Sequence, residues 1–86
     1  MNMDKQTGNG EIPSGNFIAG FRQSERLIRR ADAKKVYVAY DAARQIAEKI
    51  SALCREKGID PDASYSMEQL GKLCGIGVGC AVCVER

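Results

Sequence analysis

Short apolar runs with the composition of β-strands alternate with helix-periodic segments in this chain of 86 residues, and that alternation most restricts its fold. The strand-like runs are residues 16–19, 36–39 and 80–84. In the second run, Val36 and Tyr37 are typical strand residues, and apolar side chains on both faces favour a strand that is covered on both sides. A further segment contains Pro61 and is predicted to form a short or edge strand at best.

Three segments between these runs show the periodicity or the end signals of helices. They are residues 21–31, 41–57 and 66–74. Asp41 is predicted to be the N-cap of the second helix and Gly58 to end it. Ser66 and Gln69 fit a capping box at the start of the third helix, which Gly75 ends. The order β-α-β-α-(β)-α-β predicts an α/β fold, a three-layer α/β/α sandwich with a small mixed sheet.

The length is that of one small domain, which buries only about 60–65% of its unfolded surface. Residues 1–15 are rich in Gly, Asn, Ser and charge and are predicted to be a flexible leader, so residues 16–86 form the domain. The leader has no hydrophobic region of a secretory signal, and no apolar run approaches the roughly 20 residues that span a bilayer. We therefore expect a cytoplasmic protein.

The chain has four cysteines and no histidine. In a reducing cytosol, Cys54, Cys74, Cys80 and Cys83 are expected to act as small buried apolar residues. Because a strand alternates its side chains, Cys80 and Cys83 are predicted to point to opposite faces. We therefore expect no metal or other cofactor, although a small metal or redox protein stays open as an alternative. Without histidine, the commonest general base is missing, and we expect no enzyme.

Residues 20–35 concentrate the positive charge of the chain. They hold six basic and two acidic residues, a local net charge of +4, whereas the whole chain has a net charge of +2. Such a segment is a candidate contact for an anionic partner, although a basic helix face can also be merely solvated.

The start of this basic segment has a specific context. A turn at Gly20, where the first strand ends, would present the N-terminus of the next helix, whose backbone N–H groups attract phosphate. The guanidinium of Arg22 suits guanine O6 and N7, and Gln23 can both donate to and accept from a base edge. Arg26 and Lys34, with Arg29 and Arg30, are predicted to grip a nucleic-acid backbone without reading its sequence.

The glycine-rich run at residues 75–79 reads GIGVG. It lies between a predicted helix and a strand, whereas the glycine loops of nucleotide sites lie between a strand and a helix. No Lys-Ser/Thr pair follows it. We therefore do not predict a nucleotide site there.

Three motifs together resemble one family. Residues 20–24 (GFRQS) resemble the signature of kink-turn RNA-binding ribosomal proteins, which include the archaeal L7Ae and eukaryotic L30e proteins and short bacterial relatives of the YbxF type. Residues 35–42 (KVYVAYDA) resemble the second strand of that family and its following acidic turn. Residues 66–79 contain the family's LGxxCGIxVG pattern.

This resemblance implies a three-layer α/β/α sandwich that binds RNA bent by tandem sheared G·A pairs beside a bulge. It places Gly20, Phe21, Arg22, Gln23 and Ser24 in the major groove at those pairs. It also implies that two residues of the glycine-rich run cover a bulged nucleotide, namely Ile76 and Val78. Arg22 stands where Lys or Asn is usual, so its contact with the base is reshaped or moves to phosphate.

The predicted function is therefore that of a monomeric RNA-binding protein that recognises kink-turn RNA and is ribosome-associated or ribosomal-protein-like. The alternative is a protein-interaction module on the same fold without RNA binding, because one fold hosts several functions.

Overall fold

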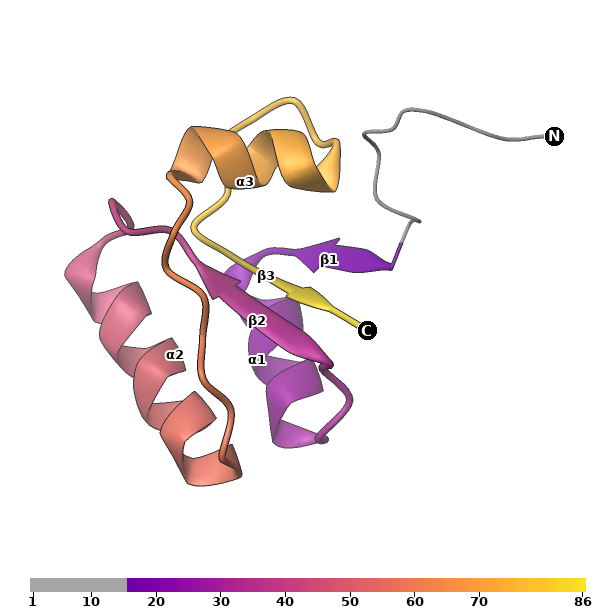
Figure 1. The fold of residues 1–86 in the computed structure, drawn as a ribbon, viewed down its shortest axis with the longest axis vertical. Helices are drawn as coiled ribbons and strands as arrows, with labels where there is room; N and C mark the ends of the chain where they lie inside the picture. Colours follow the sequence, from indigo (N-terminus) through magenta and orange to yellow (C-terminus); the bar gives the residue numbers. More distant parts are fainter. Residues whose placement is uncertain (1–15) are drawn as a thin grey trace, which may run out of the picture.

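The computed structural model describes residues 16–86, and it confirms the α/β class. The elements are, in chain order, β1 (Phe17–Ala19), α1 (Phe21–Arg29), β2 (Lys35–Val38), α2 (Arg44–Lys57), α3 (Met67–Cys74) and β3 (Val82–Glu85), as Figure 1 shows. None of the helices in this described part is long and apolar enough to cross a membrane. The leader predicted at residues 1–15 lies outside the described residues.

The three strands form one sheet in the order β1-β3-β2, and β3 runs antiparallel to both neighbours. The prediction of a mixed sheet is therefore wrong for these strands. Strands β1 and β2 do run in the same direction, but the last strand of the chain inserts between them and pairs with each. Within residues 16–86, the parallel pairing is a single isolated bridge between Tyr37 and Asp62, which is what the segment around Pro61 contributes to the sheet.

Alternation along the central strand divides the core between the two faces of the sheet. Val82 and Val84 pack with α1 and α2 on one face, where Ile28 and Ile50 are fully buried. Cys83 points to the other face, which α3 covers with the buried side chain of Leu70. Because β3 is covered on both sides, its apolar run is continuous, as expected of a central strand. Helices thus lie on both faces of the sheet (Figure 1).

The ends of two helices follow the predicted local signals. The amide of Gln69 donates to the hydroxyl of Ser66 at 3.1 Å, and the amide of Ser66 donates to Gln69 Oε1 at 2.8 Å, so the capping box is confirmed. Gly58 and Gly75 end α2 and α3 in the left-handed conformation, with φ of 73° and 70°. This conformation costs glycine little because it has no Cβ.

The start of α2 was predicted wrongly. This helix begins at Arg44 after Ala43, with no side-chain cap, so Asp41 is not its N-cap. The Oδ1 atom of Asp41 instead accepts a hydrogen bond of 2.8 Å from the amide of Met67, the first residue of α3. A carboxylate is favourable there because the N-terminus of a helix is electropositive. The cap therefore serves a helix 26 positions further along the chain.

Candidate nucleic-acid interface

Gly20 and the first turn of α1, residues 20–24, form the first candidate surface, and we call it the Gly20 turn. Gly20 has φ of 109° and ψ of 148°, and its amide donates to the carbonyl oxygen of Val82 at 3.0 Å. A Cβ at Gly20 would meet no atom within 4 Å. Glycine is required here by backbone conformation, since other residues rarely adopt this φ.

The first turn of α1 offers hydrogen-bond donors to a ligand. No side chain caps this helix end, and the first turn holds no acidic residue. The early N–H groups of a helix have no intrahelical partner, so they can donate to an anion from outside. Arg22 and Gln23 are exposed beside them. The turn therefore combines backbone donors, a guanidinium and an amide on one accessible surface.

Two predicted site residues, Phe21 and Ser24, face the protein core and hold the Gly20 turn in place. Phe21 packs against the core beside α2, and its ring lies under Lys49, whose Nζ is 6.0 Å from the ring centroid. Ser24 is fully buried, and its hydroxyl has no hydrogen-bond partner among residues 16–86. The accessible part of the Gly20 turn is therefore Gly20, Arg22 and Gln23.

The run at residues 75–79, which we call the glycine loop, is the second candidate surface. Its two large side chains are exposed, Ile76 by 43% and Val78 by 67%. The loop is tied to α3 by a hydrogen bond of 3.1 Å from the amide of Ile76 to the carbonyl of Gly71. Exposed apolar side chains on a short anchored loop can pack on the face of a base.

A hollow of about 470 Å³ lies between the glycine loop and α3. Asp41, Met67 and Lys72 line it together with the loop. These three residues were not predicted as part of a site: Asp41 is far from the loop in sequence, and Met67 and Lys72 were considered only as parts of the preceding helix. The interior glycine of α3, Gly71, was the one signal, since a glycine inside a helix often marks close backbone contact.

A short segment joins the two candidate surfaces. The glycine loop leads into Cys80, whose amide donates to the carbonyl of Met67 at 3.0 Å. Two residues later, the carbonyl of Val82 accepts the amide of Gly20. The Gly20 turn and the glycine loop therefore lie at the same end of β3.

The predicted basic contacts divide between the two ends of β3. Arg26 is exposed one helical turn after Arg22, so it extends the surface of the Gly20 turn. The amide of Lys34 donates to the carbonyl of Glu85 at 2.7 Å, at the opposite end of β3 from Gly20. At about 3.3 Å per residue, the two ends are roughly 10 Å apart. The structure thus separates Lys34 from the Gly20 turn.

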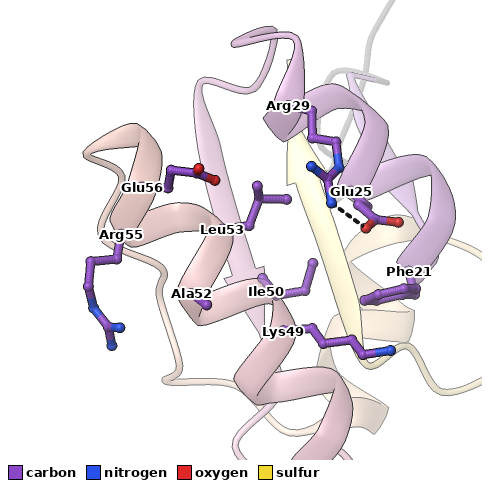
Figure 2. A pocket seen from close by; sticks show the side chains of 9 residues that line it. All are labelled: Phe21, Glu25, Arg29, Lys49, Ile50, Ala52, Leu53, Arg55 and Glu56. Atoms are coloured by element: carbon purple, nitrogen blue, oxygen red, sulfur yellow. Dashed lines mark hydrogen bonds and ion pairs between the residues drawn. The ribbon is translucent and has the colours of Figure 1, made fainter.

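A larger groove, of about 790 Å³, lies between α1 and α2 (Figure 2). Its floor is formed by Ile50 and Leu53, and Figure 2 shows the ion pair of Glu25 and Arg29 on its α1 side, 3.1 Å apart. Charges of both signs line it, and it lies away from the glycine loop. Nothing in its lining selects a ligand of one charge or shape.

The cysteines differ from their prediction in one respect. Cys54, Cys80 and Cys83 are buried as predicted, and Cys74 is half-buried. However, Cys80 and Cys83 do not point apart, because β3 begins only at Val82 and a bend at Ala81 turns Cys80 to the α3 side of the sheet. The Sγ atoms of Cys74, Cys80 and Cys83 all lie within 4.8 Å of one another.

Contacts within this group shift the pKa values of its thiols. Hydrogen bonding with Cys83 lowers the pKa of Cys80 to about 6. The same contact, together with burial, raises the pKa of Cys83, and burial raises the pKa of Cys74. Burial also raises the pKa of Cys54, which lies in the other half of the core. A thiolate in the group is therefore best stabilised on Cys80.

Comparisons with known proteins agree with the fold and with the motifs. The family model described as "Ribosomal protein L7Ae/L30e/S12e/Gadd45 family" matches residues 10–86. The chain is 36% identical over 70 residues to the RNA-binding protein YbxF of Geobacillus stearothermophilus, covering 81% of this chain and 85% of that protein. It is 38% identical over 66 residues to an RNA-binding protein of Bacillus pumilus, covering 77% and 80% of the two chains.

Among solved structures, the Giardia lamblia 15.5kD RNA binding protein superposes with a TM-score of 0.74 at 24% identity. The match covers 81% of this chain and 59% of that one, and at this identity it supports the fold alone. The family model, by contrast, extends over all of the described residues, and the two bacterial relatives match over most of their own length. The chain therefore belongs to the ribosomal protein L7Ae/L30e/S12e/Gadd45 family.

Proposed function

We propose that this protein binds kink-turn RNA at its tandem sheared G·A pairs. The observation that carries the proposal is the pairing of two exposed surfaces at one end of β3. One is an uncapped helix end that bears Arg22 and Gln23, and the other is the glycine loop with exposed Ile76 and Val78. The first suits phosphates and base edges, and the second suits the apolar face of a base that has left the helical stack.

The residues of the Gly20 turn have different roles in this proposal. Arg22 and Gln23 contact guanine edges in the major groove, which a kink makes accessible, and the adjacent backbone N–H groups bind phosphate. Gly20 allows the close approach of the backbone, while Phe21 and Ser24 hold the turn from the core side. The turn thus reads the RNA, and its buried members fix its shape.

The remaining predicted contacts add affinity. Ile76 and Val78 cover a bulged nucleotide, for which their exposure leaves room. Arg26 neutralises a phosphate one helical turn beyond Arg22. Lys34 lies at the other end of β3, so its positive charge attracts the RNA backbone over a distance and does not contact the G·A pairs.

The relatives support this class of activity, since the YbxF protein and its Bacillus pumilus counterpart are both named RNA-binding proteins. We accordingly propose a binding protein and not an enzyme. In this proposal the protein is monomeric and cytoplasmic, and it binds RNA either in the ribosome or as a free kinked RNA.

A gel-shift series tests the proposal. The full chain is titrated against a standard kink-turn RNA and against the same RNA with its G·A pairs changed to Watson–Crick pairs, at several salt concentrations. We expect tighter binding to the kink-turn and a loss of roughly 5- to 150-fold in Gln23→Ala, the equivalent of one bidentate base contact. We expect Arg26→Ala to weaken binding to both RNAs alike and to lower the salt slope by about 1, as for a lost phosphate contact.

Arg55→Ala is the matched control, because Arg55 is an exposed arginine in the last turn of α2, away from both surfaces. It should leave the preference for the kink-turn unchanged. Equal binding of the two RNAs by the unmodified protein would refute specific recognition. No RNA affinity at near-physiological salt would favour the protein-interaction alternative.

A further inference from the structure

Three cysteine thiols converge beneath the end of α3, although they come from three separate segments. Cys74 is the last residue of α3, Cys80 follows the glycine loop, and Cys83 lies in β3. Their Sγ atoms all lie within 4.8 Å of one another. Cys80 and Cys83 are 4% and 0% exposed, and Cys74 reaches the surface.

Cys54, by contrast, acts as a buried apolar residue in this protein. It is fully buried in the core cluster of α1 and α2, on the opposite side of the sheet from the three thiols. Among residues 16–86, the one cluster of metal-ligating side chains comprises Cys74, Cys80 and Cys83. Packing alone accounts for Cys54, but it does not account for three sulfur atoms that face one another.

We propose that Cys74, Cys80 and Cys83 bind one thiophilic metal ion, either zinc or monovalent copper. Thiolate ligands select these soft or borderline ions over Mg²⁺ and Ca²⁺. At a zinc–sulfur distance of about 2.3 Å, two sulfur atoms that share an ion lie about 4 Å apart. The thiols need to move closer by less than about 1 Å, which small side-chain rotations provide.

The layout of the group gives the ion a path and a coordination geometry. The half-buried Cys74 is the entry side, while Cys80 and Cys83 form the closed floor. Three thiolates complete the trigonal coordination of monovalent copper. Zinc would take a fourth ligand, water or a small thiol, on the Cys74 side. Any thiol that is still protonated releases its proton to solvent as its sulfur binds the ion, so affinity rises with pH.

The test uses the full chain, purified under reducing conditions and stripped of metal. Cadmium, as a spectroscopic substitute for zinc, and monovalent copper under anaerobic conditions are each added up to one equivalent. We expect a sulfur-to-metal charge-transfer absorption that saturates at one ion per chain, and native mass spectrometry should show the same stoichiometry. Competition by zinc for the cadmium site, or its failure, identifies which ion the site prefers.

Cys74→Ser is the critical variant, since this half-buried position tolerates a hydroxyl better than the fully buried ones do. It should lower the affinity by roughly 100-fold or more, because even the loss of an outer-shell partner costs up to that much. Cys54→Ala is the control with all three ligands intact and should retain the affinity. The proposal is overturned if neither ion produces the absorption in the unmodified chain. It is also overturned if Cys74→Ser binds as tightly as the unmodified protein.

Discussion

Replacing Gly71 by alanine tests whether the glycine loop is held in place by backbone contact with α3. Gly71 is buried inside this helix. A Cβ there would overlap the carbonyl oxygen of Val78, and it would lie 2.9 Å from the carbonyl carbon of Val78 and 3.3 Å from the Cα of Gly79. All of these are backbone atoms, so no side-chain rotation relieves the overlap. Either the loop or the helix must move.

The size of the effect follows from two opposing contributions. Overpacking of a closed contact costs up to about 3 kcal/mol. Alanine in place of glycine inside a helix returns about 1 kcal/mol. We therefore expect Gly71→Ala to lower the free energy of unfolding by about 2 kcal/mol, which lowers the Tm of a domain of this size by about 8–16 °C. Urea denaturation followed by circular dichroism measures this change.

Because the overlap displaces Val78, the same variant should weaken kink-turn binding even at a temperature where it is fully folded. Gly58→Ala is the matched control. A Cβ at Gly58 meets no atom within 4 Å, and its φ of +73° alone makes alanine cost about 1–2 kcal/mol. Gly58 ends α2, on the far side of the molecule from the glycine loop (Figure 1).

The two variants should lose similar stability, and only Gly71→Ala should lose affinity for the RNA. If Gly71→Ala is as stable as the unmodified protein, helix propensity outweighs the contact and the reasoning fails. If both variants lose RNA affinity equally, the effect is one of general destabilisation and not of loop position.

Two further substitutions test local features of the fold. Ala31 has φ of 57°, a left-handed conformation that destabilises the folded state by about 1–2 kcal/mol for a non-glycine residue. After the higher unfolded-state entropy of glycine is deducted, Ala31→Gly should raise the free energy of unfolding by about 0.5–1 kcal/mol. An unchanged or lower urea midpoint would contradict this. Hydrogen bonds from Ser64, with the nearby Lys35, lower the pKa of Asp62, so its contribution to stability is present above the unfolded pKa of about 3.9 and is lost as the pH falls through the folded value. The difference in urea midpoint between the unmodified protein and Asp62→Asn should therefore shrink between pH 7 and a pH below that range, and a difference independent of pH would show that the carboxylate charge is not involved.

The parts of the fold that the sequence predicts correctly are those with local causes. The capping box of Ser66 and Gln69 and the left-handed glycines Gly58 and Gly75 depend on residues within one helical turn, and the structure contains all of them. Asp41 was assigned wrongly because its side chain had two possible partners, the nearby α2 and the distant α3. Local spacing favours the first, and tertiary packing provides the second.

The sheet shows the same limit. Composition identified the strands, but the direction of pairing depends on which strand inserts between β1 and β2. That place is taken by β3, the last strand of the chain. Its pairing with β1 joins the two ends of the domain, and its pairing with β2 is also between residues far apart in sequence. In the candidate site, the sequence pattern likewise did not predict which side chains are exposed to solvent. Ser24 lies inside the core, whereas Gln23 next to it is exposed.

A single backbone carbonyl connects the two proposed sites. The oxygen of Val82 accepts the amide of Gly20 at 3.0 Å and also the thiol of Cys80 at 3.0 Å. When Cys80 binds a metal ion as a thiolate, it cannot donate this hydrogen bond, and of the two donors the carbonyl of Val82 keeps only the amide of Gly20, which begins the Gly20 turn. Any resulting change in RNA affinity is reciprocal, because coupling between two binding sites is one free energy. An ion that strengthens RNA binding by some factor is itself held more tightly, by that factor, in the RNA complex.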